Sequence, residues 1–268
     1  MVKINMDKRG LNCKQVFSAF SSQTQKKGQV TIFIIIGIVI VVGILSFFLW
    51  IQPTYLSRTG ATLGFEGCVE DAVKEAIGEL ELKAGFVNPE FTYLYNGEEL
   101  TYLCYTNNYY ETCSVQVPFL KNVFDEQMEI LIRDKVDSCY ENSVGDLKAR
   151  GYSVVSGVVD YDVLIEPSVI RVEIDAPTVV ESQQFARFNV KVNAPTYDMV
   201  MIATSILQFE TKYGDSDVSS MMNFYPDYLI RKIKRGDGTT VYFLEHKTLG
   251  NKFQFASRSL AWPAGYDV

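Results

Sequence analysis

Hydrophobic residues recur along this chain with three different spacings, and each spacing predicts a different kind of element. The first is an unbroken apolar run from Ile32 to Ile51, twenty residues that include no charged side chain. At about 1.5 Å per helical residue such a run spans roughly 30 Å, the thickness of a bilayer's hydrocarbon core. The pattern therefore predicts a transmembrane helix within residues 29–52.

The second spacing, three and four residues, is typical of helices with one buried face. It occurs over residues 66–84, where Gly85 is expected to end the helix, and over residues 119–149, a longer helix. Between them lies a tyrosine-rich segment, residues 90–118, which predicts a hairpin.

The third spacing, two residues, begins beyond residue 152 and is typical of half-buried strands. Ile170, Val172 and Ile174 alternate with charged residues, and residues 186–192 alternate in the same way. The other expected elements are a strand over 161–166, a helix over 196–213 and a three-stranded meander over about 227–235, 239–247 and 252–260.

These elements predict an α+β protein, in which an N-terminal transmembrane helix precedes a disulfide-stapled ectodomain of helices packed on antiparallel sheets. We expect a basic cytoplasmic leader over 1–28, the transmembrane helix over 29–52, a connector over 53–65, a helix–hairpin–helix half with the disulfides over 66–151 and a β-rich half with one central helix over 152–268.

The charges on the two sides of the apolar run differ in sign. Residues 1–28 carry six basic side chains and one acidic side chain, a net charge of +5, and because the whole chain carries −7, residues 29–268 carry −12. Basic residues beside a span are retained in the cytoplasm, so we expect a single pass in the cell membrane with the C-terminal domain extracytoplasmic. The expected partners are the lipid bilayer and other envelope proteins or copies of this chain, and the acidic charge argues against nucleic acid.

The five cysteines are divided by this topology. Cys13 is expected to be a cytoplasmic free thiol, whereas four cysteines in an oxidising compartment predict two disulfides with three alternative pairings. A four-residue turn at 107–110 would place Cys104 directly opposite Cys113, which leaves Cys68 to pair with Cys139. A metal site of four thiolates is the alternative, but no C-x₂-C spacing is present and the chain has one histidine, so no metal or cofactor is expected.

Six tyrosines fall within residues 93–110 together with several asparagines. Tyrosine suits strands, and this accounts for the composition without any ligand. Tyrosine and asparagine are also typical of recognition surfaces. The predicted contact surface consists of Tyr93, Tyr95, Tyr102, Tyr105, Asn107, Asn108, Tyr109 and Tyr110.

Few other residues suggest chemistry. The basic run of residues 231–235 indicates either an edge strand protected by charge or a contact with an acidic neighbouring copy. The single histidine, His246, falls within an expected strand with no nucleophile elbow nearby, and no P-loop, GxGxxG or HExxH sequence occurs. We therefore expect no enzyme, although an acid pair cannot be recognised from spacing alone and a carboxylate-dependent hydrolase stays an alternative.

The membrane entry reads Lys-Lys-Gly-Gln-Val-Thr from Lys26 to Thr31 and continues into the apolar run. This resembles the class III signal peptide of archaeal type IV pilin-like proteins, in which a peptidase cuts between glycine and glutamine and the exposed helix packs into a filament. The resemblance implies cleavage between Gly28 and Gln29. It departs from the family at Phe33, where a glutamate is usual.

The resemblance covers the N-terminus only, and the ectodomain is similar to uncharacterised archaeal envelope proteins. The leading hypothesis is therefore a single-pass, membrane-anchored cell-envelope protein with a binding or structural ectodomain. A pilin-like filament subunit cleaved after Gly28 is the first alternative, and a membrane-tethered carboxylate-dependent hydrolase is the second.

Overall fold

The computed structural model describes residues 34–44, 46 and 63–261. The chain divides into two compact units, residues 1–60 and residues 61–268. In the first unit residues 34–44 are helical and their large apolar side chains are exposed. The expected leader, with Cys13, Gly28 and Gln29, lies outside the described residues, as do both ends of the expected transmembrane helix and most of the connector. No helix in the described part of the chain combines the length and the apolar character that a membrane span requires.

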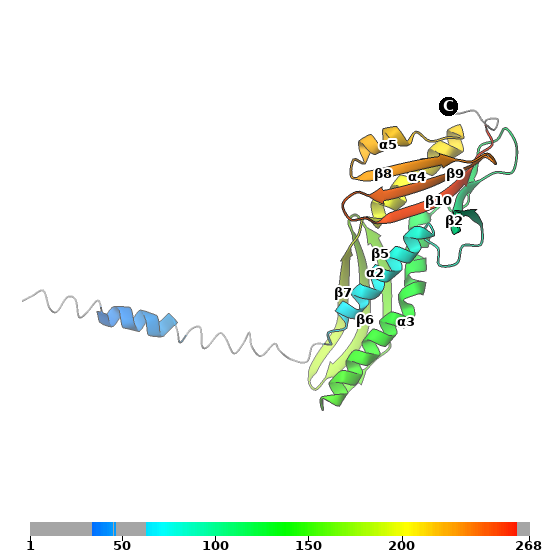
Figure 1. The fold of residues 1–268 in the computed structure, drawn as a ribbon. Coiled ribbons are helices and arrows are strands. Elements are labelled where there is room, and N and C mark those ends of the chain that lie inside the picture. Colours follow the sequence, from blue (N-terminus) through cyan, green and yellow to red (C-terminus); the bar gives the residue numbers. More distant parts are fainter. Residues whose placement is uncertain (1–33, 45, 47–62, 262–268) are drawn as a thin grey trace, which may run out of the picture. The chain divides into compact units, whose positions relative to one another are not determined.

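Two long helices of the second unit lie side by side (Figure 1). Helix α2 spans Glu66–Leu82 and helix α3 spans Leu120–Ala149. Both bury the apolar face that their periodicity predicts, with Val69, Val73 and Leu80 of α2 fully buried. Cys68 and Cys139 lie at disulfide distance, with 5.9 Å between their Cα atoms, so the predicted pair joins the two helices.

A four-stranded antiparallel sheet packs against these helices (Figure 1). Its long central strand is β6, which pairs with β4 and β5 along one edge and with β7 along the other. The period-two pattern places alternate apolar side chains toward the helices and polar ones toward solvent. The strands are β4 (Val154–Ser156), β5 (Asp160–Glu166), β6 (Val169–Val180) and β7 (Gln183–Asn193).

A second sheet contains six strands in the order β1-β2-β10-β9-β8, with β3 paired to β2. Its strands are β1 (Thr92–Tyr95), β2 (Glu98–Tyr105), β3 (Ser114–Val115), β8 (Tyr228–Lys234), β9 (Thr239–His246) and β10 (Lys252–Arg258). Helix α4 (Thr196–Tyr213) covers one face of the sheet, and the short helix α5 (Val218–Phe224) lies beside β8. Figure 1 shows α4 crossing behind β8, β9 and β10.

Strands β2 and β10 pair in parallel, although we expected antiparallel sheets. The pairing joins the helix–hairpin–helix half to the β-rich half, because β2 belongs to the first and β10 to the second. One hydrophobic core contains residues from both halves, including Phe124 of α3, Val172 of β6 and Phe255 of β10.

The predicted pairing of Cys104 with Cys113 is confirmed, but the predicted register of the hairpin strands is wrong. Cys104 and Cys113 lie at disulfide distance, with 5.4 Å between their Cα atoms. In the ladder, however, Cys104 faces Val115 instead of Cys113. The connection is longer than a four-residue turn, and its backbone bonds to β10 and to the segment after it: the amide of Thr106 donates to the carbonyl of Arg258, and the amide of Tyr110 donates to the carbonyl of Leu260.

Most other predicted elements are confirmed with their ends shifted by no more than three residues, whereas β6 continues beyond the predicted alternation at Ile174 to Val180. Strands β1 and β4 and helix α5 were not predicted as separate elements. The Gly236–Gly238 turn joins β8 to β9 as expected, with the amide of Gly238 donating to the carbonyl of Arg235.

Candidate functional site

The two faces of the six-stranded sheet are different because successive side chains point in opposite directions. The inner face packs on α4 and holds large buried residues such as Tyr242, Phe253 and Phe255. On the opposite, outer face, Leu100, Tyr102, Val241 and Ala256 form a second, smaller cluster that is separate from the main core.

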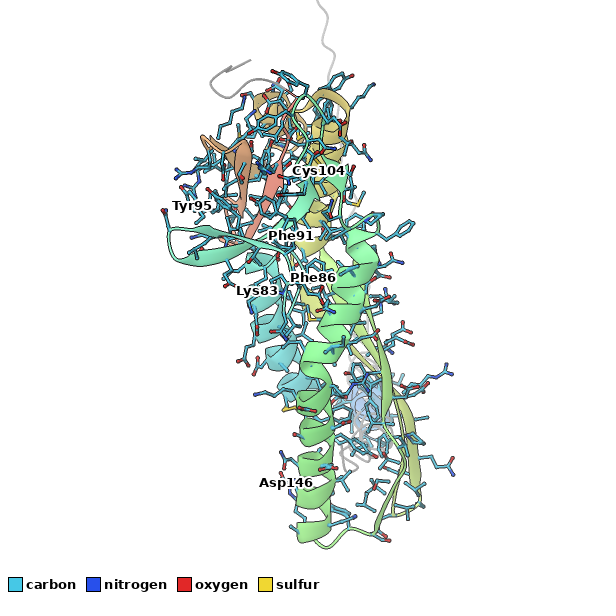
Figure 2. All side chains as sticks on the ribbon, turned by 90° about the vertical axis from the view of Figure 1, so that its right-hand side faces the viewer. Lys83, Phe86, Phe91, Tyr95, Cys104 and Asp146 are labelled. Carbon is cyan, nitrogen blue, oxygen red and sulfur yellow. A yellow bond between two sulfur atoms is a disulfide. The ribbon has the colours of Figure 1, made fainter. Side chains whose placement is uncertain are left out.

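Aromatic and arginine side chains surround this small cluster. We call them the aromatic–arginine face: Phe91, Tyr93, Tyr95, Tyr105, Arg231, Arg235, Phe243 and Arg258. They come from the segment before β1, from β1, β2, β8, β9 and β10, and from the residue after β8. Figure 2 shows Tyr95 near the tip of the β1–β2 hairpin and Phe91 closer to α2 and α3. Four of the eight residues predicted as a contact surface are thus tyrosines of this sheet, and three of those lie on this face.

Each arginine of the face lies over an aromatic ring. The guanidinium carbon is 5.0 Å from the ring centroid of Phe243 for Arg231, 5.6 Å from that of Tyr95 for Arg235 and 5.4 Å from that of Tyr105 for Arg258. A ring face attracts a cation, so each ring helps to hold the arginine that lies over it.

Arg258 differs from the other two arginines because its N–H groups are used within the chain. It donates to the carbonyl oxygens of Asp237 and Thr106, to the Tyr105 hydroxyl and to the side-chain oxygen of Asn107. This fixes the predicted contact residue Asn107 beside Tyr105. Arg258 therefore organises the face.

Arg231 and Arg235 are exposed and available. Within the described residues neither of them lies within 4.0 Å of a carboxylate oxygen, although the chain as a whole carries a net charge of −7. The rows of donors that they present match carboxylate, phosphate or sulfate groups. The face can therefore bind an anionic group without first breaking an internal ion pair.

The neighbouring lysines on β8 point to the other side of the sheet. Lys232 and Lys234 lie 2.8 Å and 3.1 Å from the carboxylate oxygens of Asp215. Burial alone would raise the pKa of Asp215, but the hydrogen bonds from the two lysines outweigh it and lower the pKa. Strand periodicity therefore divides the basic run: Lys232 and Lys234 form ion pairs on the inner face, and Arg231 and Arg235 lie on the outer face without an ion pair among the described residues. Strand β8 is an edge strand, as predicted.

Tyr102 does not contribute an accessible surface, contrary to its predicted role in contact. It is 7% exposed, and its hydroxyl shares a hydrogen bond of 2.9 Å with the hydroxyl of Thr239. Burial raises the pKa of this phenol. Its ring supports Phe91, Tyr93 and Tyr105 from below, with centroid distances of 4.8, 5.9 and 5.1 Å.

The remaining predicted contact residues lie in the connection between β2 and β3. Tyr109 and Tyr110 are 77% and 79% exposed, and Asn108 donates to the carboxylate of Glu111. Tyr110 has a positive φ of 65°, a conformation that bulky residues seldom adopt. The loop therefore displays two tyrosine rings to solvent beside the sheet edge.

Two glutamates are buried, which makes them the candidates for carboxylate chemistry. Burial raises the pKa of Glu81 and of Glu210 to about 7 in each case. Glu81 accepts hydrogen bonds from Thr196 and Asn251, and Glu210 accepts one from the Tyr242 hydroxyl. Their exposed fractions are 2% and 1%, so neither carboxyl can reach a substrate in solvent, and we assign both to the core.

His246 and Asp217 have structural environments. His246 is half-buried at the end of β9, and its Nδ1 accepts hydrogen bonds from the amides of Thr248 and Leu249. Asp217 caps helix α5 by accepting from the amides of Ser219 and Ser220. Over residues 34–44, 46 and 63–261 no group of three or more His, Cys, Asp and Glu side chains is placed to hold a metal ion.

Sequence reasoning missed Arg258, Phe91 and Phe243 and did not separate Arg231 and Arg235 from the lysines between them. The period of two on β8 was the one available signal, because it places residues 231 and 235 on the same face. The rings that hold them come from other strands, which local spacing does not indicate. Comparison of the chain with protein-family models, with curated proteins and with solved structures found no match.

Proposed function

We propose that this chain is a single-pass, membrane-anchored envelope protein whose extracytoplasmic unit binds anionic partners through the aromatic–arginine face. The observation that carries the binding role is the pair Arg231 and Arg235, which are held on aromatic rings and have no carboxylate partner within the described residues. Residues of this kind, rigid aromatics with arginine, dominate the energetics of protein recognition surfaces.

The anchor and the topology rest on the sequence. The uncharged run from Ile32 to Ile51 has the length of a span, and its basic flank favours a cytoplasmic N-terminus. The pairing of Cys68 with Cys139 and of Cys104 with Cys113 suits an oxidising compartment outside the cytoplasm.

Cys13 provides a test of the topology without any substitution. A membrane-impermeant maleimide applied to whole cells should leave Cys13 unlabelled, and the same reagent should label it once the cells are lysed. The four cysteines in disulfides should react only after reduction. Labelling of Cys13 in intact cells would invert the proposed topology.

Poly-L-glutamate serves as the anionic probe for the binding role. The full chain in detergent micelles is titrated with it, with poly-L-lysine as the reversed-charge probe. We expect the double substitution Arg231→Ala and Arg235→Ala to weaken the binding of poly-L-glutamate by about tenfold or more, because two charge-assisted contacts are lost. The matched control is Arg133→Ala with Arg150→Ala, which removes the same charge and includes an arginine that also lies over a ring, that of Tyr161. Equal losses in both variants would contradict the proposal.

The pilin-like alternative depends on the leader alone. Cleavage between Gly28 and Gln29 is tested by N-terminal peptide mapping of the chain from native membranes. A mature N-terminus at Gln29 would favour the filament-subunit alternative, and an intact leader would favour the uncleaved anchor.

A further inference from the structure

The outer face of the four-stranded sheet carries an unusual set of like charges. In the ladder between β5 and β6, Asp160 faces Asp175 and Asp162 faces Glu173, and all four side chains are exposed. Like charges directly opposite each other destabilise a sheet. This arrangement therefore opposes the stability of the strands that carry it.

The compensation within the chain is incomplete. Arg187 lies 3.2 Å from Asp175, and Arg171 lies 3.7 Å from Glu173. Within the described residues Asp160 and Asp162 lie in no ion pair. The four carboxylates line a hollow of about 370 Å³ together with Arg187, so the hollow has a clear excess of negative charge. We call these four side chains the acidic patch.

The acidic patch and the aromatic–arginine face are complementary in charge and in chemistry. The acidic patch presents four carboxylates around a hollow, and the aromatic–arginine face presents two exposed guanidinium groups, those of Arg231 and Arg235, each over an aromatic ring. We propose that the aromatic–arginine face of one copy of this chain binds the acidic patch of a second copy. This inference rests on the proposed function, because it names the anionic partner of the same face.

A second copy is favoured over another anionic partner because each copy carries both surfaces. Anchoring in one membrane also confines the copies and raises their effective concentration, so that a modest contact suffices. Because the two surfaces differ, the contact is head-to-tail, and each bound pair retains one free surface of each kind. Association therefore continues into rings or linear assemblies.

The test uses two charge-reversal variants of the full chain in detergent micelles. The first is Arg231→Glu with Arg235→Glu, and the second is Asp160→Lys with Asp162→Lys. Sedimentation velocity should show concentration-dependent association of the unmodified chain, weakened in about 1 M NaCl, where the Debye length falls to about 3 Å. Each variant alone should associate about tenfold more weakly or not at all.

Mixing the two variants is the decisive step. An equimolar mixture should associate again, because the reversed face of one variant meets the reversed face of the other and the unmodified faces also meet. Restoration also shows that both variants are folded. The control variant, Lys135→Glu with Lys148→Glu, changes the charge by the same amount on exposed positions of α3 and should associate like the unmodified chain.

Three results would overturn the inference: an unmodified chain that stays monomeric, variants that associate as strongly as the unmodified chain, or a mixture that fails to associate. The proposed function can survive each of them, because the binding of poly-L-glutamate is measured separately. Failure of the unmodified chain to bind poly-L-glutamate would contradict the proposed function itself.

Discussion

The guanidinium of Arg231 lies 5.0 Å from the centroid of the Phe243 ring, and the two residues face each other in the ladder between β8 and β9. Strand pairing thus places a cation over an aromatic ring at the open edge of the sheet. Arg235, directly after β8, lies over the ring of Tyr95 in β1, although β8 and β1 are the first and last strands of the sheet order. The face is consequently built by the tertiary fold from strands that are distant in sequence.

Replacement of Phe243 by Leu tests whether the ring orients Arg231. Leucine keeps apolar bulk but provides no ring face, so we expect the affinity for poly-L-glutamate to fall by about two- to fivefold, the value of an exposed cation–π contact. Isothermal titration calorimetry measures the change. The same substitution at Phe185 of β7, also half-buried, is the control and should leave the affinity unchanged. An unaffected Phe243→Leu variant would show that the ring does not position the arginine.

Local periodicity was sufficient to predict most of the elements. Ile170, Val172 and Ile174 alternate with charged residues because one side of β6 packs against the helices, and this requirement is visible in sequence. The pairing of β2 with β10 was not predictable in the same way. Strands more than a hundred residues apart in the chain become neighbours through the packing of the whole unit, which spacing does not encode.

The candidate site also contains residues that the local sequence predicts and residues that only the tertiary fold brings together. Composition alone identifies Tyr93 and Tyr95, whereas Phe243 and Arg258 require knowledge of the strand order. Composition also predicts Tyr102 at the contact surface, yet Thr239 and the small apolar cluster enclose it. Burial in a tertiary cluster overrides what the local composition indicates.

The buried glutamates predict a pH dependence of stability. Their pKa values are about 7 in the folded chain, whereas the ordinary value, taken for the unfolded chain, is 4.5. Between these two pH values the folded chain therefore binds more protons than the unfolded chain. The stabilisation is fully present below about pH 4.5 and is lost as the pH rises through 7, by about 3 kcal/mol for each group. Urea unfolding at pH 5 and pH 8 measures it. We expect the free energy of unfolding to be lower at pH 8.

The variant Glu81→Gln should reduce this pH dependence, because one of the two titrating groups is removed. Glu75→Gln, at an exposed position of the same helix, is the matched control and should keep the full dependence. A dependence that is equal in all three proteins would mean that Glu81 does not titrate in this range.

The two cysteine pairs predict unequal losses of stability on removal. They close loops with sequence separations of 71 and 9 residues, and loop entropy assigns about 4 kcal/mol to Cys68–Cys139 and about 3 kcal/mol to Cys104–Cys113. We expect the double serine variant of the first pair to lose more stability in urea unfolding. A larger loss from the second pair would indicate that its contact with Ser257, at 3.5 Å from Cys113, matters more than chain entropy.

Gly85 follows the end of α2, in a conformation and a space that together require glycine. Its φ is +93°, and a Cβ at this position would lie 2.8 Å from a ring carbon of Phe124, which is fully buried in the core. Gly97 has nearly the same φ, +91°, but a Cβ there meets no atom within 4 Å. Alanine at either position carries the cost of a left-handed backbone, about 1–2 kcal/mol. Only Gly85→Ala also forces Phe124 to move, which adds about 1–3 kcal/mol in a well-packed core. Urea unfolding of the two variants isolates this second cost, because subtracting one loss from the other removes the shared backbone penalty. Equal losses would show that Phe124 yields without cost and that the close packing between the end of α2 and α3 does not stabilise the fold.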